Sequence, residues 1–204
     1  MFITLNIQLI TSADINLTLD VVEDGKTYQE NAGKKALEFA QASGLISLAD
    51  DSGLEVDALN GAPGLYSARY SSKPNATDAD RRSYLLQNLN DKTRPWKAHF
   101  HATIAIAIPE SFWSQVARHL TIQKQASGLH IEFAEGNCYG EIISEERGTN
   151  GFGYDPIFLF PELNKTMAEL DSEYKNQISH RGIAVMNAMP ILKKVMESGS
   201  SCTR

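Results

Sequence analysis

The segment over residues 97–108 restricts the possible folds more than any other part of the sequence. Its apolar residues recur at every second position, from Phe100 through Ile104 to Ile108, which is typical of a β-strand. In the second half the intervening residues are alanines, so this half is predicted to be buried on both faces. Pro109 ends the pattern, and we therefore expect one long strand here.

Capping residues predict the helices. Thr27 followed by Glu30 is a capping box, and Gly44 supplies a stop, so a helix is expected between them. Further helices are expected over residues 78–89, capped by Thr77, and from Ser179 or His180 to about Met196. Shorter strands are expected over residues 5–10, 129–133 and 137–143, and a short apolar run follows at residues 157–160.

Two adjacent carboxylates, Asp50 and Asp51, interrupt an apolar run. Ser52 and Gly53 follow, and alternation resumes at Leu54, which predicts a strand, a tight turn and a second strand. Adjacent carboxylates repel each other and are costly to bury without a cation beside them. Because hard cations prefer carboxylate oxygens, one interpretation is a pair of magnesium ligands. The alternative is a solvated turn, and both remain open on these residues alone.

The loop over residues 148–156 is rich in glycine. Glycines let backbone N–H groups approach phosphates or the edge of a base. Phe152 and Tyr154 offer ring faces on which a base could stack. The alternative is a sharp turn whose aromatic side chains fill the core.

Cationic side chains gather around the expected start of the last helix. Because helix N-termini favour anions, Lys175 and Arg181 are candidate phosphate contacts. The alternative is a solvated basic patch. His180 could equally be a buried or capping histidine.

The composition excludes several classes of protein. The net charge of -6 argues against a general binder of nucleic acid or of membrane surfaces. Cys138 and Cys202 lie far apart, so a disulfide framework is not expected, which suits the cytoplasm. The opening residues have neither the basic stretch of a signal peptide nor the length to span a bilayer. We expect one two-lobed domain over residues 1–197 and a disordered tail over residues 198–204.

Four motifs in a fixed order resemble the inosine/xanthosine triphosphate pyrophosphatase family, whose members remove non-standard purine nucleotides from the nucleotide pool. The motifs are Leu48-Ala-Asp-Asp-Ser-Gly-Leu54, Gly61-Ala-Pro-Gly-Leu-Tyr-Ser-Ala-Arg-Tyr70, Gly151-Phe-Gly-Tyr-Asp-Pro-Ile-Phe158 and Lys175-Asn-Gln-Ile-Ser-His-Arg-Gly182. The resemblance extends over residues 6–194.

The resemblance implies roles for individual residues. Asp51 would be the catalytic proton acceptor and a Mg²⁺ ligand, with Asp50 supporting the metal. A glutamate at or near Glu23 would also bind the metal, although the register leaves Val22 as an alternative position. Substrate contacts would come from Ser52, Phe152, Gly153, Tyr154, Asp155, Lys175, His180 and Arg181.

The resemblance also implies the fold and the reaction. The fold would be α/β, with a long twisted mixed sheet, flanking helices and two lobes around a central cleft, and the subunits would form a homodimer. The reaction would be Mg²⁺-dependent hydrolysis of dITP, ITP or XTP to the monophosphate and pyrophosphate. We expect no nucleic-acid or membrane partner.

One feature of the family is missing at the start of the sequence. The family begins with a strand, a Thr-x-Asn-x-x-Lys phosphate loop and a helix. Here Thr4-Leu-Asn6 echoes the loop, but Leu9 stands where lysine is needed. We therefore expect an N-terminal truncation, and also an insertion over residues 110–128. A nucleotide-binding homologue with impaired catalysis is one alternative function, and a phosphatase of related fold acting on other nucleotides is another.

Overall fold

The structure is a computed structural model that describes residues 7–112 and 129–200. The chain divides into two compact units. The first unit contains residues up to Asp51, Thr103–Ala134 and the chain from Val185 onward, and the second contains Ser52–Ala102 and Glu135–Ala184. The three long strands contribute residues to both units.

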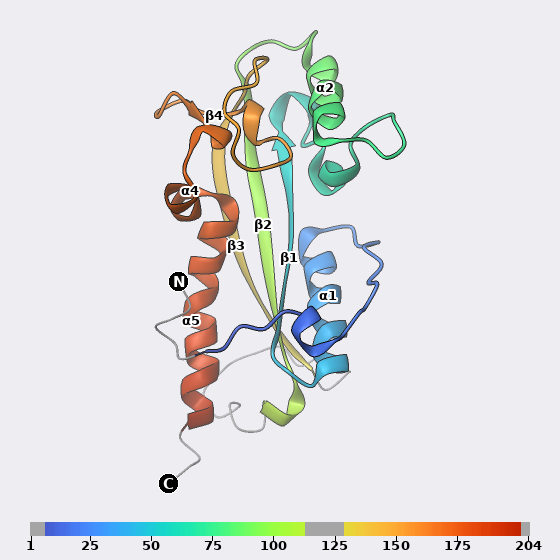
Figure 1. The fold of residues 1–204 in the computed structure, drawn as a ribbon, viewed down its shortest axis with the longest axis vertical. Coiled ribbons are helices and arrows are strands. Elements are labelled where there is room, and N and C mark those ends of the chain that lie inside the picture. Colours follow the sequence, from blue (N-terminus) through green and yellow to red (C-terminus); the bar gives the residue numbers. More distant parts are fainter. Residues whose placement is uncertain (1–6, 113–128, 201–204) are drawn as a thin grey trace. The chain divides into compact units, whose positions relative to one another are not determined.

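The described strands form one five-stranded sheet in the order β1-β2-β3-β4-β5. Their bounds are β1 (Ser47–Val56), β2 (Trp96–Ile108), β3 (His130–Ile142), β4 (Phe158–Phe160) and β5 (Lys165–Thr166). Figure 1 shows β1, β2 and β3 as long neighbouring strands. β4 pairs antiparallel with both β3 and β5, so this sheet is antiparallel where a mixed one was expected. The predicted α/β fold with a long sheet and flanking helices is confirmed.

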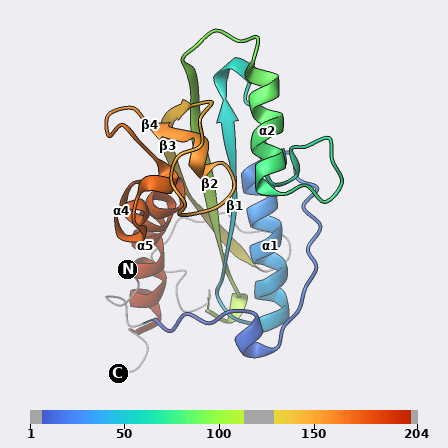
Figure 2. The same cartoon turned by 45° about the horizontal axis from the view of Figure 1, so that its top comes forward.

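Helices α1, α2 and α5 begin close to the predicted residues, whereas α4 was not predicted. The helices are α1 (Tyr28–Ser43), α2 (Asp78–Leu89), α4 (Ser172–Ile178) and α5 (His180–Ser200), with short 3₁₀ helices at Ala13–Ile15, Asp57–Leu59, Gly64–Arg69, Asp155–Ile157 and Met167–Glu169. The Thr27 side chain accepts a hydrogen bond from the Glu30 N–H, and Gly44 ends α1 in the left-handed conformation. Thr77 and Asp80 form a capping box at α2. Only Ser179 separates α4 from α5 in the chain. Figure 2 shows α4 next to the start of α5.

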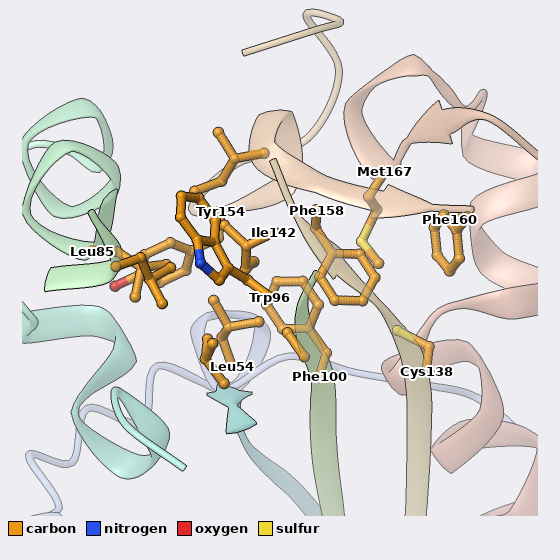
Figure 3. Packing of buried hydrophobic residues seen from close by; sticks show 14 of the residues in the cluster. Leu54, Leu85, Trp96, Phe100, Cys138, Ile142, Tyr154, Phe158, Phe160 and Met167 are labelled. Atoms are coloured by element: carbon orange, nitrogen blue, oxygen red, sulfur yellow. The ribbon is translucent and has the colours of Figure 1, made fainter. Parts of the chain in front are cut away.

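Each unit has its own apolar core. In the second unit, large side chains of β1, β2, β3, β4 and α2 pack together, and Figure 3 shows Leu54, Leu85, Trp96, Phe100 and Phe158 among them. In the first unit, the three buried alanines of α1 pack against Ala105, Ala107, Leu129 and Ile131, with Leu37 partly buried beside them. Small residues let α1 approach the strands closely, which places its polar side chains beside β1.

The burial of β2 agrees with the pattern predicted from its sequence. Every residue of β2 from Ala102 to Ile108 is buried, whereas the first part alternates between buried and more exposed positions. None of the helices in the described residues combines the length and apolar character needed to cross a membrane.

Two predicted strand interruptions were wrong. The turn expected at Asp50 to Gly53 does not form, because β1 is continuous from Ser47 to Val56 and pairs with β2. Similarly, β3 continues through Gly136, where two strands were expected. A Cβ atom at Gly136 would lie 2.2 Å from the His180 carbonyl oxygen, so this glycine permits close packing of α5 on the strand.

The predicted ends of the chain also differ from the structure. Residues 7–10 form no strand, and the side chains of Leu9 and Ile10 are exposed rather than packed on a sheet. Residues 5 and 6 lie outside the described part, as does most of the expected insertion. Helix α5 continues to Ser200, into the segment expected as a tail.

Candidate functional site

Four side chains of the first unit form a group around the predicted catalytic carboxylate. We call Glu23, Asn31, Lys35 and Asp51 the Asp51 cluster. Asn31 and Lys35 lie one turn apart on α1 and therefore share a face of that helix. Asn31 is buried, its Nδ2 donates to Asp51 Oδ2 at 3.0 Å, and its Oδ1 accepts from the Gly25 N–H at 2.8 Å. This single amide ties the Asp51 carboxylate to the segment that carries Glu23.

Lys35 lies between the two carboxylates of the cluster. Its Nζ is 2.8 Å from Oε1 of Glu23 and 3.8 Å from Oδ1 of Asp51. The side chains of Lys35 and Asp51 are only 20% and 14% exposed, so water screens this attraction less than at an open surface. The ammonium group offsets the repulsion between two carboxylates that face the same space.

The donor chemistry of the cluster suits Mg²⁺. Magnesium takes hard oxygen ligands and is usually held by one or two carboxylates together with substrate phosphates. Glu23 and Asp51 are such a pair, whereas Val22 has no ligating side-chain atom. In the described residues, no three His, Cys, Asp or Glu side chains gather into a metal site by themselves. Protein ligands alone would therefore not complete the coordination of the ion.

Asp50 and Ser52 flank Asp51 in β1. Because successive residues of a strand point to opposite faces, Asp50 points away from the face that carries Asp51. Asp50 is exposed, and Ser52 is half-buried. Asp50 therefore does not join the Asp51 cluster.

The second unit carries the glycine loop predicted from the sequence, and we call residues 151–155 the Phe152 loop. Asp155 is buried, and its Oδ2 accepts hydrogen bonds from the Phe152 N–H at 3.0 Å and from Lys175 Nζ at 2.6 Å. Gly151 has a φ of 81°, and a Cβ there would lie 2.0 Å from this same carboxylate oxygen. Glycine at this position therefore allows the Asp155–Lys175 ion pair to form beneath the loop.

Helix α2 holds the Phe152 loop from another direction, which sequence reasoning missed. Asp78 Oδ2 accepts from the Gly153 N–H at 2.7 Å, and this bond, with the neighbouring Arg81, lowers the pKa of Asp78. Arg82 Nη1 donates to the Gly153 carbonyl oxygen at 2.8 Å. The same guanidinium makes a two-pronged ion pair with Glu146, at 2.8 Å for both contacts, which lowers the pKa of Glu146.

These bonds change the predicted role of the glycines. One of the two interpretations of the sequence was a loop whose backbone N–H groups approach a ligand. Instead, the N–H groups of Phe152 and Gly153 donate to the carboxylates of Asp155 and Asp78. These two backbone N–H groups are therefore bonded within the protein, so a ligand would meet a side chain of the loop instead.

The Phe152 ring is the exposed part of the loop. The residue is 60% exposed, and Lys175 Nζ and Arg181 Cζ each lie 5.4 Å from the ring centroid. An aromatic face next to two cations suits a ligand that combines a flat ring with negative charge. Phe152, Asp155, Lys175 and Arg181, which the family resemblance implies as substrate contacts, thus lie together in the second unit.

Tyr154 and His180 lie in the core of the second unit. Tyr154 is 4% exposed, its hydroxyl donates to the Ser67 carbonyl oxygen at 2.9 Å, and burial raises its pKa (Figure 3). His180 is 8% exposed and stacks on Phe100, with the ring centroids 4.7 Å apart. Burial lowers the pKa of His180 to about 3, so its ring is neutral at pH 7. Neither ring offers a stacking face to a ligand.

Comparison with known proteins gives one family. The model of the Ham1 family matches residues 2–191. A dITP/XTP pyrophosphatase from Desulforamulus reducens is 43% identical over 190 residues, which cover 92% of this chain and 85% of the relative. A dITP/XTP pyrophosphatase from Desulfotalea psychrophila is 45% identical over 179 residues, which cover 88% of this chain and 71% of the relative.

Solved structures give the same result. A HAM1 protein from Coxiella burnetii superposes with a TM-score of 0.77 at 40% identity and covers 93% of this chain and 88% of its own. The Ham1 protein of Staphylococcus aureus gives a TM-score of 0.74 at 40% identity, over 89% of this chain and 84% of its own. With the sequence motifs, both cores and both groups of polar residues in place, this chain belongs to the Ham1 family.

Proposed function

We propose that this chain hydrolyses non-canonical purine nucleoside triphosphates, dITP, ITP and XTP, to the monophosphate and pyrophosphate. The observation that carries the proposal is the Asp51 carboxylate, held by a buried amide and a lysine in a chain whose relatives are named dITP/XTP pyrophosphatases. The exposed Phe152 ring with its two cations supports the choice of a nucleotide as substrate.

Asp51 acts as the proton acceptor. The Asn31 amide holds Oδ2 in place, and Oδ1, the oxygen nearer Lys35, takes a proton from the attacking water. The water attacks the α-phosphorus, the bond from this phosphorus to the bridging oxygen breaks, and pyrophosphate leaves with that oxygen. Lys35 lies 3.8 Å from Asp51 and can neutralise phosphate charge there.

Magnesium is the metal that fits the cluster, with Asp51 and Glu23 as its ligands. When bound, it would withdraw charge from the phosphate oxygens and so favour the departure of pyrophosphate. The carboxylates of Asp51 and Glu23 lie on either side of the Lys35 ammonium, a place that already favours positive charge.

Phe152 and Arg181 recognise the purine. The base stacks on the exposed ring, and Arg181 offers only hydrogen-bond donors. A 6-oxo group accepts such a bond, whereas the 6-amino group of adenine is itself a donor and cannot accept from the guanidinium. Mismatches of this kind can discriminate strongly between substrates. Lys175 adds a positive charge at the same ring.

The experiment measures products from ITP with Mg²⁺. Release of pyrophosphate and IMP in equal amounts, with ATP a poor substrate, is the expected result. Tight binding of ITP without turnover would instead support the binding homologue, which the leucine at position 9 favours because the family has lysine there. Release of orthophosphate would favour a phosphatase acting on other nucleotides.

We also infer a homodimer in the cytoplasm. The family resemblance supports the dimer, and the acidic charge with no expected disulfide suits a reducing compartment. Sedimentation equilibrium of the purified chain tests the dimer directly, since a single species with the mass of one chain would contradict it.

A further inference from the structure

An exposed ring cannot be held in place by burial. Phe152 is 60% exposed, so apolar packing does little to fix its direction. The direction of its Cα–Cβ bond depends instead on the two peptide groups that flank the residue. Anything that fixes both peptide groups also fixes where the ring points.

Side chains from separate elements hold the peptide groups around Phe152. Its own N–H donates to Asp155 Oδ2 at 3.0 Å, which fixes the peptide before it. The Gly153 N–H donates to Asp78 Oδ2 at 2.7 Å, which fixes the peptide after it. The Gly153 carbonyl accepts from Arg82 at 2.8 Å, which fixes the next peptide as well.

The side chains of Asp78 and Arg82 are themselves held by ion pairs. The Arg82 side chain is 11% exposed and donates two hydrogen bonds of 2.8 Å to the Glu146 carboxylate. Asp78 also pairs with Arg81, whose Nη1 donates to the Ala76 carbonyl at 2.6 Å. The helix start is in turn capped by Thr77, whose Oγ1 accepts from the backbone N–H of residue 80 at 3.2 Å. The bonds to Gly153 therefore come from a rigid support.

From this geometry we propose that Asp78 and Arg82 are positioning residues that pre-organise the Phe152 ring for the purine base. The proposal rests on the function proposed above and goes beyond it, because both residues act through the loop and not on the substrate itself. Ordering a flexible loop on binding lowers affinity, so a loop already fixed in the free protein binds more tightly. Losing one of these bonds should weaken substrate binding and leave the chemical step unchanged.

The chain offers a matched control for Asp78. Asp80 is also an acidic residue in the first turn of α2, but its carboxylate bonds Thr77 and Lys73 and not the loop. Asp78→Ala and Asp80→Ala both remove an acidic group from the helix start. Only the first releases Gly153. Asp78→Asn keeps a side-chain oxygen that can accept from Gly153 and serves as the conservative rescue.

The experiment measures four quantities for these variants and for Arg82→Met. They are KM and kcat for ITP, the Kd for ITP in an Asp51→Asn background, and hydrogen exchange of the peptide that contains Gly153. We expect Asp78→Ala to raise KM and Kd about tenfold, equivalent to about 1.4 kcal/mol. Its kcat should stay within about twofold, and exchange at Gly153 should accelerate. Arg82→Met should raise KM and Kd in the same direction.

The controls separate this proposal from the function on which it rests. Asp80→Ala and Asp78→Asn should leave KM, Kd and exchange near the wild-type values. Equal rises of KM in Asp78→Ala and Asp80→Ala would overturn the proposal in favour of simple helix destabilisation, as would faster exchange without any change in affinity. Absence of ITP turnover in the wild type would contradict the proposed function, while Kd and exchange would still test the positioning role.

Discussion

The Asp51 cluster and the Phe152 loop use carboxylates in opposite ways. In the Asp51 cluster, the carboxylates of Glu23 and Asp51 face a lysine, and both contribute oxygens beside that cation. In the Phe152 loop, Asp155 and Asp78 direct oxygens at backbone N–H groups. The first arrangement places carboxylates where a proton or a metal ion can be handled, whereas the second fixes a backbone so that an apolar ring can be presented.

Asp51→Asn is the sharpest test of the first arrangement. An amide cannot take a proton from water, so we expect kcat for ITP to fall by about 10³-fold with the fold intact. Asp24→Asn is the control, because Asp24 also pairs with a lysine of α1, Lys34, but at an exposed position. Steady-state kinetics should show Asp24→Asn within about twofold of the wild type. Activity retained in Asp51→Asn would remove it from the catalytic role.

Gly151→Ala tests whether the second arrangement depends on buried geometry. Alanine would be strained at a φ of 81°, and its Cβ would lie 2.0 Å from Asp155 Oδ2 and displace the ion pair with Lys175. We expect a loss of about 3 kcal/mol in the free energy of unfolding, measured by urea denaturation.

Gly153→Ala is the matched variant for Gly151→Ala. Gly153 also has a positive φ, of 59°, but a Cβ added there would meet no atom within 4 Å. Only the backbone strain remains, so a loss of about 1 kcal/mol is expected. Equal losses in the two variants would show that strain, and not the buried carboxylate, decides the effect.

The sequence predicted the two groups unequally, for a physical reason. Local signals such as the Thr27 and Thr77 caps depend on neighbours in the chain, and the structure confirms both. The bond from Asp78 to Gly153 joins residues far apart in the sequence, and no local pattern marks it. A single sequence carries no signal for such a pairing, although the helix over residues 78–89 and the glycine-rich loop were each predicted.

Tertiary structure also overrode local turn signals. Asp50, Asp51, Ser52 and Gly53 favour a turn, yet pairing with β2 satisfies their backbone and keeps β1 extended. The sequence predicted a break in β3 near Gly136. The strand is continuous instead, and the glycine is needed for the close packing of α5 on it. The alternation of β2 was reliable because burial itself produces that pattern.

His180 is a buried histidine of the second unit whose low pKa makes the stability of the protein depend on pH. The buried ring faces Cys138 of β3, lies next to Arg181, and is affected by the charges of Lys175 and His101, while burial is the main cause of its low pKa of about 3. Since an unfolded histidine titrates near pH 6.5, the unfolded state binds more protons below that pH. The stability contributed by the neutral ring is therefore complete above about pH 6.5 and falls as the pH decreases toward 3.

We expect His180 to account for about 2–3 kcal/mol of the stability lost between pH 6.5 and pH 4. In His180→Phe, which keeps a ring stacked on Phe100, the free energy of unfolding should depend less on pH over this range. Urea denaturation at several pH values measures the slope. A slope equal to that of the wild type would show that His180 is not protonated on unfolding.

The last prediction concerns Phe152, whose ring would hold the base through one face. Stacking of a base on an aromatic side chain contributes about 1–3 kcal/mol. Phe152→Ala should therefore raise KM for ITP about tenfold with kcat nearly unchanged, and Phe152→Tyr should restore the wild-type value. Phe152→Leu keeps apolar volume beside Lys175 and Arg181 without the aromatic face. If leucine restores KM as well as tyrosine does, position 152 supplies apolar contact area and not stacking. A fixed ring orientation would then contribute nothing to binding of the base.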